Sequence, residues 1–227
     1  MEIETIRIAG LTISEPVTSF TDVILAIISI ALCIRIRVRM HESYFTNAWR
    51  FFFLFMGLST GIGAVAHGIG TLHSAAFSTL WMVMNLCCSV AVYWALRATI
   101  LFTRITPPWN KIFQAVNVGT LISFIGLTLF NNDFEIFKIH AAVGLFLIFL
   151  THLIAYFRSH QGSGWIVSGM LLSFLTVLIH TRQISISNWF NYKDISHVIM
   201  MGSLLLIYGG IYRMSRNLRL SVFRSSI

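Results

Sequence analysis

The sequence predicts an all-α, polytopic membrane protein, a bundle of seven transmembrane helices. Of the 227 residues, 56% are hydrophobic and only 11% are charged, whereas soluble domains carry about 25% charged residues. Seven apolar segments each approach the roughly 20 residues that an α-helix needs to cross about 30 Å of hydrocarbon. These two observations exclude a soluble enzyme, a disulfide scaffold and a disordered chain.

The seven segments are separated by short connections that carry turn residues such as Pro107, Pro108 and Gly162. Their predicted ranges are Val17 to Ile36, Trp49 to Leu72, Ala75 to Leu96, Ile112 to Phe130, Ile136 to Phe157, Trp165 to Ile179, and Ile195 to Met214. We therefore predict three regions: an outer N-terminal segment over 1–16, the seven-helix domain over 17–214, and a basic cytoplasmic tail over 215–227. The alternating apolar residues of the first segment favour a short extended or interfacial segment that lies against the end of the bundle.

The charge distribution predicts the orientation of the chain in the membrane. With seven crossings, 12 of the 16 Lys and Arg residues fall on the side of the C-terminus. The positive-inside rule makes that side cytoplasmic and places the N-terminus outside. We expect an integral protein of a bacterial inner membrane or a plasma membrane, whose basic residues bind lipid headgroups and not nucleic acid, with a homo-oligomer or a complex partner possible.

Ionisable residues gather in the outer half of the predicted bundle. Five of the eight histidines lie there, and their numbers are His67, His73, His140, His180 and His197. Glu15 and Asp22 are seven residues apart at the start of the first helix and share one face with Ser19. Charged groups at this depth are expected to face the bundle interior and to find partners, because a charge that faces lipid costs several kcal/mol.

Two of the histidines have informative neighbours. His67 shares a helix face with Ser59, Gly63 and Gly70, and such small residues let another helix approach closely. On the last helix, Asp194 and His197 are three residues apart, a spacing at which a carboxylate can orient an imidazole or join it at a metal.

Three segments resemble the motif helices of the CREST superfamily. They are EPVTSFTDVILAI at the start of the first helix, GLSTGIGAVAHG in the second, and KDISHVIMMGSLLLIYGG in the seventh. That superfamily comprises seven-helix membrane proteins that include the alkaline ceramidases and the progestin and adipoQ receptors, many of them zinc-dependent lipid amide hydrolases. The resemblance is greatest to the alkaline ceramidase branch.

The resemblance implies a zinc site with His67 and His197 as ligands. Position 63, where the family has a serine, holds Gly63, and position 193, where it has a further histidine, holds Lys193. The family's aspartate in the third helix has no counterpart. The third ligand would come from Asp194, His180, His73 or Asp22, and Asp194 is the one we expect. Asp22 and Glu15 are the expected general base or supporting carboxylates.

Three functions from different classes follow. The first is a zinc-dependent hydrolase of a lipid amide or ester, in which a metal-bound water is the nucleophile. The second is a non-enzymatic bundle without metal, either a complex subunit or a receptor-like protein. The third is a b-type haem protein with axial histidines such as His67 and His140. A retinal protein is excluded, because the last apolar segment has no lysine for a Schiff base.

Overall fold

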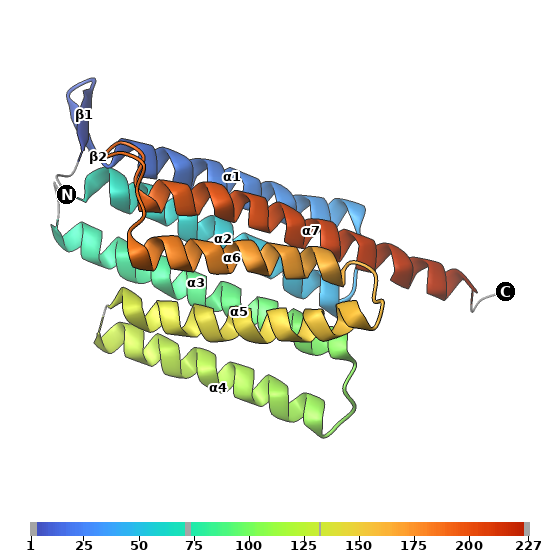
Figure 1. Ribbon diagram of the computed structural model, residues 1–227. Helices are drawn as coiled ribbons and strands as arrows, with labels where there is room; N and C mark the ends of the chain where they lie inside the picture. Colours follow the sequence, from blue (N-terminus) through green and yellow to red (C-terminus); the bar gives the residue numbers. More distant parts are fainter. Residues whose placement is uncertain (1–3, 71–73, 132, 225–227) are drawn as a thin grey trace.

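Seven long helices run alternately up and down in a single bundle (Figure 1). The computed structural model describes residues 4–70, 74–131 and 133–224. The helices are α1 Pro16–Arg39, α2 Tyr44–Ile69, α3 Ser74–Thr103, α4 Trp109–Phe130, α5 Phe134–Phe157, α6 Ser163–Arg182 and α7 Tyr192–Arg224. Each is long and apolar enough to cross a membrane, so the predicted all-α bundle of seven helices of membrane-spanning length is confirmed.

Several helices extend beyond their apolar runs. α2 begins at Tyr44, five residues before the predicted start, because Ser43 and Thr46 form a capping box around its first turn. α3 continues to Thr103 and α7 to Arg224, so the predicted tail after Met214 begins as a continuation of α7. Polar residues at a membrane surface can remain helical, so hydropathy alone does not locate the ends of the helices.

A two-stranded hairpin precedes the bundle. Strands β1 (Thr5–Ile8) and β2 (Leu11–Ser14) pair in antiparallel register, with Thr5 opposite Ser14. The turn residues Ala9 and Gly10 both have positive φ, as a type I′ turn requires. The predicted extended segment is thus confirmed, and its pairing as a hairpin is added by the structure. We call this end of the bundle the hairpin end, and the opposite end, where α1, α3 and α5 finish, the arginine end.

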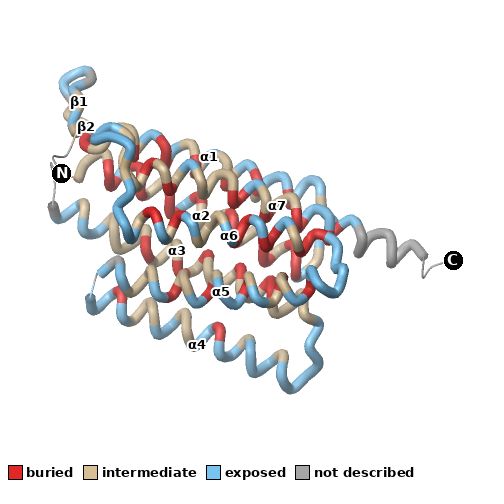
Figure 2. The backbone as a smooth tube through the Cα atoms, viewed as in Figure 1, coloured by how far each residue is buried: buried red, intermediate tan, exposed pale blue. Residues whose placement is uncertain are grey.

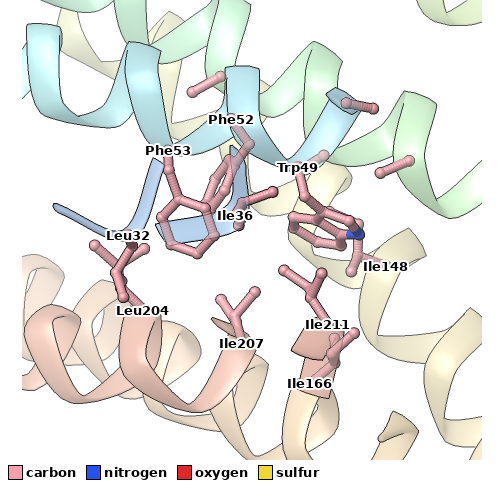
Figure 3. Close-up of a cluster of buried hydrophobic side chains, with 14 of the residues drawn as sticks. Leu32, Ile36, Trp49, Phe52, Phe53, Ile148, Ile166, Leu204, Ile207 and Ile211 are labelled. Carbon is pink, nitrogen blue, oxygen red and sulfur yellow. The ribbon is translucent and has the colours of Figure 1, made fainter. Parts of the chain in front are cut away.

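The core lies among α1, α2, α3, α5, α6 and α7, and Figure 3 shows part of it. Trp49 and Phe53 of α2 are fully buried and point toward Leu204, Ile207 and Ile211 of α7. By contrast, α4 is at the periphery and is largely exposed (Figure 2). Its exposed residues are mainly apolar, so α4 is suited to contact with lipid.

Glycine lets α6 and α7 approach closely. A Cβ at Gly210 of α7 would lie 2.7 Å from the carbonyl oxygen of Gly162 and 2.7 Å from Ile166 Cγ1. A Cβ at Gly169 of α6 would lie 2.7 Å from Ile207 Cγ1. Such small-residue contacts drive helix association in lipid, where apolar burial alone does not.

Gly210→Ala should therefore destabilise the bundle by about 1–3 kcal/mol, the usual range for overpacking, because the backbone of Gly162 cannot move aside. Gly119→Ala on α4 is the matched control, since nothing lies within 4 Å of its Cβ position. Thermal unfolding in detergent measures both. A lower Tm for the Gly119 variant than for the Gly210 variant would contradict this account of the interface.

Candidate functional site

Glu15 is the residue at which the hairpin becomes the first helix. It is the N-cap of α1 and is followed by Pro16, which suits the first position of a helix. Its φ of 43° is left-handed, a conformation that costs a non-glycine residue about 1–3 kcal/mol. The Glu15 N–H donates to the carbonyl oxygen of Glu4 at 2.8 Å. The hairpin therefore holds Glu15 in a strained conformation at the hairpin end.

The Glu15 carboxylate joins three helices. Oε2 lies 2.5 Å from His67 Nδ1 of α2, and Oε1 forms an ion pair with Lys193 of α7. Burial alone would raise the pKa of Glu15, but the hydrogen bond to His67 and the charges of His67 and Lys193 lower it to about 2. Glu15 is therefore ionised at neutral pH and shared between an imidazole and an ammonium group.

A second polar group lies deeper, between α1 and α7. The Thr21 hydroxyl donates to the carbonyl oxygen of Thr18, and its oxygen lies 2.9 Å from His197 Nδ1. The other ring nitrogen, Nε2, lies 3.4 Å from Asp22 Oδ1. Asp22 is 3% exposed, and Ser19 on the same side of α1 donates to the carbonyl oxygen of Ala64. The predicted inward face of α1 is confirmed.

Position 63 is glycine because Asp22 occupies its side-chain space. A Cβ on Gly63 would lie 2.9 Å from Asp22 Oδ2 and 3.2 Å from the Met84 sulfur. Ser59, one turn earlier, donates to the carbonyl oxygen of Met84 on α3. The predicted row of small residues on α2 therefore admits α1 on one side and α3 on the other.

Asp194 has a structural role that spacing to His197 does not reveal. Its Oδ2 accepts from the backbone N–H of Asn191 at 2.7 Å, while Asn191 Oδ1 accepts from the N–H of Lys193 at 2.9 Å. These two bonds cap the start of α7 in a variant of the capping box, in which the Asn191 side chain binds the second N–H of the helix instead of the third. The signal was present in the sequence as Asn191 followed three residues later by an acid. This role fixes Asp194 at the helix end.

The proposed ligands His67, His197 and Asp194 have separate partners. His67 contacts Glu15, His197 contacts Thr21 and Asp22, and Asp194 caps α7. Across residues 4–70, 74–131 and 133–224, no three His, Cys, Asp or Glu side chains are grouped as a metal ion would require. The structure thus gives the three expected ligands different partners and does not bring them together at one point.

The other outer histidines of the described residues have aromatic neighbours. His140 stacks on Phe124 of α4, with ring centroids 4.5 Å apart, and His180 packs edge-on against Tyr192 at 5.0 Å. The ring of His67 packs edge-on against Trp81 of α3. His73 lies outside the described residues.

A cavity of about 330 Å³ opens beside Glu15 at the hairpin end. Its lining comes from the hairpin, the start of α1, the connection between α6 and α7, and the start of α7. The lining residues are Glu4, Glu15, Pro16, Val17, Thr18, Gln183, Asn188, Trp189, Asn191, Tyr192 and Lys193. Sequence reasoning identified Glu15 but not this cavity, because the α6–α7 connection shows no periodic pattern.

The depressed pKa of Glu15 makes stability depend on pH. The folded state holds this pKa near 2, below its ordinary value of 4.5, so the stabilisation is present above about pH 4.5 and is lost as pH falls toward 2. We expect Glu15→Gln to lower the Tm at neutral pH and the difference from the unsubstituted protein to narrow over that acid range. Thermal unfolding across pH measures this.

Glu135→Gln is the control, because Glu135 pairs with Lys138 at the surface, where ion pairs contribute about 0–1 kcal/mol. Its Tm should stay close to that of the unsubstituted protein. A difference for Glu15→Gln that stays constant from pH 7 to pH 2 would contradict the pairing.

Comparison with known proteins assigns the chain to a family. Neither a curated protein nor a solved structure matches the chain. A family model matches residues 17–216, a range that begins in α1 and ends in α7. The chain therefore belongs to the family of unknown function DUF6962.

Proposed function

We propose that this protein is a receptor-like membrane protein that binds a small ligand with a cationic group in the cavity at its hairpin end. The observation that carries the proposal is the position of Glu15, which lines the cavity and also joins α1, α2 and α7 through His67 and Lys193. A ligand at this cavity thus touches the residue on which three helices converge.

The chemistry of the lining supports a cationic group. Glu4 and Glu15 supply two carboxylates and Lys193 one ammonium, so the charged residues of the lining sum to −1. Trp189 and Tyr192 add aromatic faces, which attract ammonium groups by about 0.5–2 kcal/mol. Asn188 and Gln183 provide neutral amides that can orient a second polar group. A quaternary or primary ammonium of small size fits this combination.

Binding of a ligand in this cavity would change contacts inside the bundle. A cation drawn to Glu15 competes with Lys193 for the same carboxylate, and weakening that ion pair loosens the start of α7 from α1. The ligand thereby has different contacts in the paired and unpaired arrangements, which is the requirement for a ligand to shift a conformational equilibrium.

The proposed orientation places the hairpin end outside the cell. The helices finish with Arg35, Arg37 and Arg39 on α1 and with Arg104 and Arg158 after α3 and α5. The positive-inside rule makes this arginine end cytoplasmic, in a bacterial inner membrane or a plasma membrane. The cavity then faces the exterior, where a receptor-like protein meets its ligand.

Single cysteines test this orientation. In a background without the native cysteines, Ser187→Cys in the α6–α7 connection should react with an impermeant maleimide in intact cells, and Ser43→Cys before α2 should react only after permeabilisation. Gel-shift labelling measures both. The reverse pattern would place the cavity in the cytoplasm.

The ligand proposal is tested with choline and with glycine betaine as probes, by isothermal titration on purified protein. Glu4→Gln should weaken binding about fivefold to tenfold, the effect of roughly 1–1.4 kcal/mol, because it makes the charge of the lining neutral. Glu135→Gln, at the same end but outside the cavity lining, should not change the affinity. Heats no larger than those with glycerol for both probes would refute the cationic ligand.

A zinc-dependent lipid hydrolase is the second candidate, and one distance favours it. His197 Nε2 and Asp22 Oδ1 lie 3.4 Å apart, close to the roughly 3.3 Å that separates two ligands of a tetrahedral zinc with bonds of about 2.0–2.1 Å. His197 Nδ1 is also held by Thr21, as the second nitrogen of a metal-bound histidine usually is. The set lacks a third ligand among the described residues, so no metal-dependent step follows from it.

Metal content decides between the two candidates. A hydrolase with zinc at this pair should contain about one zinc per chain when purified without chelator, and His197→Ala and Asp22→Asn should each remove most of it. His160→Ala, at the arginine end, is the control. The receptor-like proposal expects no stoichiometric zinc, and a full equivalent lost only in the two variants would replace it with the hydrolase.

A further inference from the structure

A second cavity, of about 770 Å³, lies at the arginine end of the bundle. It is bounded by the ends of α3 and α5, the connection from α5 to α6, the start of α2 and Met214 of α7. Its volume is within the range of about 300–1,000 Å³ that is typical of sites for small molecules. It is separated from the Glu15 site by the length of the bundle, because the two cavities are at opposite ends (Figure 1).

One part of the lining is strongly basic. Arg104 follows the last residue of α3, Arg158 follows the last residue of α5, and His160 lies two residues further on. Among the described residues that line this cavity, none is acidic. The carbonyl ends of two helices carry about half a negative charge each, so they reduce the charge of the two arginines without cancelling it. Each arginine guanidinium group can bind a phosphate through two parallel hydrogen bonds.

The other part of the lining is apolar. Leu101 and Phe102 of α3, Ile154 and Ala155 of α5, and Met214 of α7 form it. Phe102 packs against His152 with the two rings tilted, and their centroids are 4.7 Å apart. His152 is fully buried, and neither of its ring nitrogens has a hydrogen-bond partner in the described part of the chain. The apolar wall therefore continues into the core, while the basic groups stay at the membrane surface.

We infer that this cavity binds an anionic phospholipid of the adjacent leaflet, with its phosphate between Arg104 and Arg158 and the start of an acyl chain against Leu101, Phe102 and Ile154. The two halves of the lining match the two halves of such a molecule, at the depth where headgroup and chain meet. A soluble phosphate would satisfy the arginines but would leave the apolar wall unfilled. The positive-inside rule explains basic residues at this end, but it does not explain their convergence on an apolar cavity.

The test measures binding to delipidated protein by native mass spectrometry and by the shift in Tm. The probes are phosphatidylglycerol, phosphatidylcholine with the same chains, and soluble glycerol 3-phosphate. Arg104→Gln and Arg158→Gln alter exposed side chains, so both variants should fold. Lys111→Gln is the matched control, a basic residue at the same end that is exposed and outside the cavity lining. Thr151 also lines the cavity, and Thr151→Phe should narrow the cavity beside its apolar wall while both arginines are kept.

We expect phosphatidylglycerol to bind at least tenfold more tightly than phosphatidylcholine. Each arginine variant should reduce its binding at least fivefold, and the Lys111 variant should leave it within twofold. Thr151→Phe should weaken the lipid but not glycerol 3-phosphate.

Three results would overturn the inference. One is equal binding of the two lipids, and another is loss of binding in the Lys111 variant equal to that in the arginine variants. The third is a Tm shift with glycerol 3-phosphate as large as with the lipid, which would identify a site for a soluble anion. None of these measurements depends on the ligand of the hairpin-end cavity.

Discussion

Hydrocarbon offers no hydrogen bonds, so a polar group inside a membrane-spanning bundle is stabilised by a partner within the protein. The helices satisfy the backbone. For the side chains, α1 is the element on which the arrangement depends, because it presents Glu15, Ser19, Thr21 and Asp22 to α2 and α7. These contacts determine how α1 is rotated about its axis and which helices lie against it.

The contacts of α1 also explain the residues at positions 63 and 193, where the sequence departs from the expected zinc motif. Gly63 has no side chain, and the Asp22 carboxylate occupies the space beside it. Lys193 forms an ion pair with Glu15. Glycine at position 63 and lysine at position 193 are therefore compatible with each other. The Asp22 carboxylate of α1 lies against α2, and the Lys193 ammonium of α7 balances the charge of Glu15. The contacts of Glu15, Asp22 and Lys193 form an ionic network.

The two ends of the bundle carry cavities of different chemistry. At the hairpin end, a polar cavity is lined by amides, carboxylates and aromatic rings from connections that extend beyond the helices. At the arginine end, the cavity combines guanidinium groups with an apolar wall inside the bundle. The first suits a small polar molecule from water, and the second suits an amphiphile from the leaflet. The core of Trp49, Phe53 and the isoleucines of α7 separates them.

The sequence by itself determined the class of protein, the number of helices and the candidate residues Glu15, Asp22, His67 and His197. These follow from local properties: apolar length sets a membrane span, and an ionisable group inside it must face inward. Helix ends were less accurate, since the caps at Ser43 and Asn191 extend α2 and α7 beyond their apolar runs. Only the tertiary structure decided the pairings, namely Glu15 with His67 and Lys193, His197 with Thr21 and Asp22, and Asp194 with its own helix end. The reason is physical: a partner is chosen by the rotation and separation of helices, which depend on glycine contacts and core packing far apart in the chain.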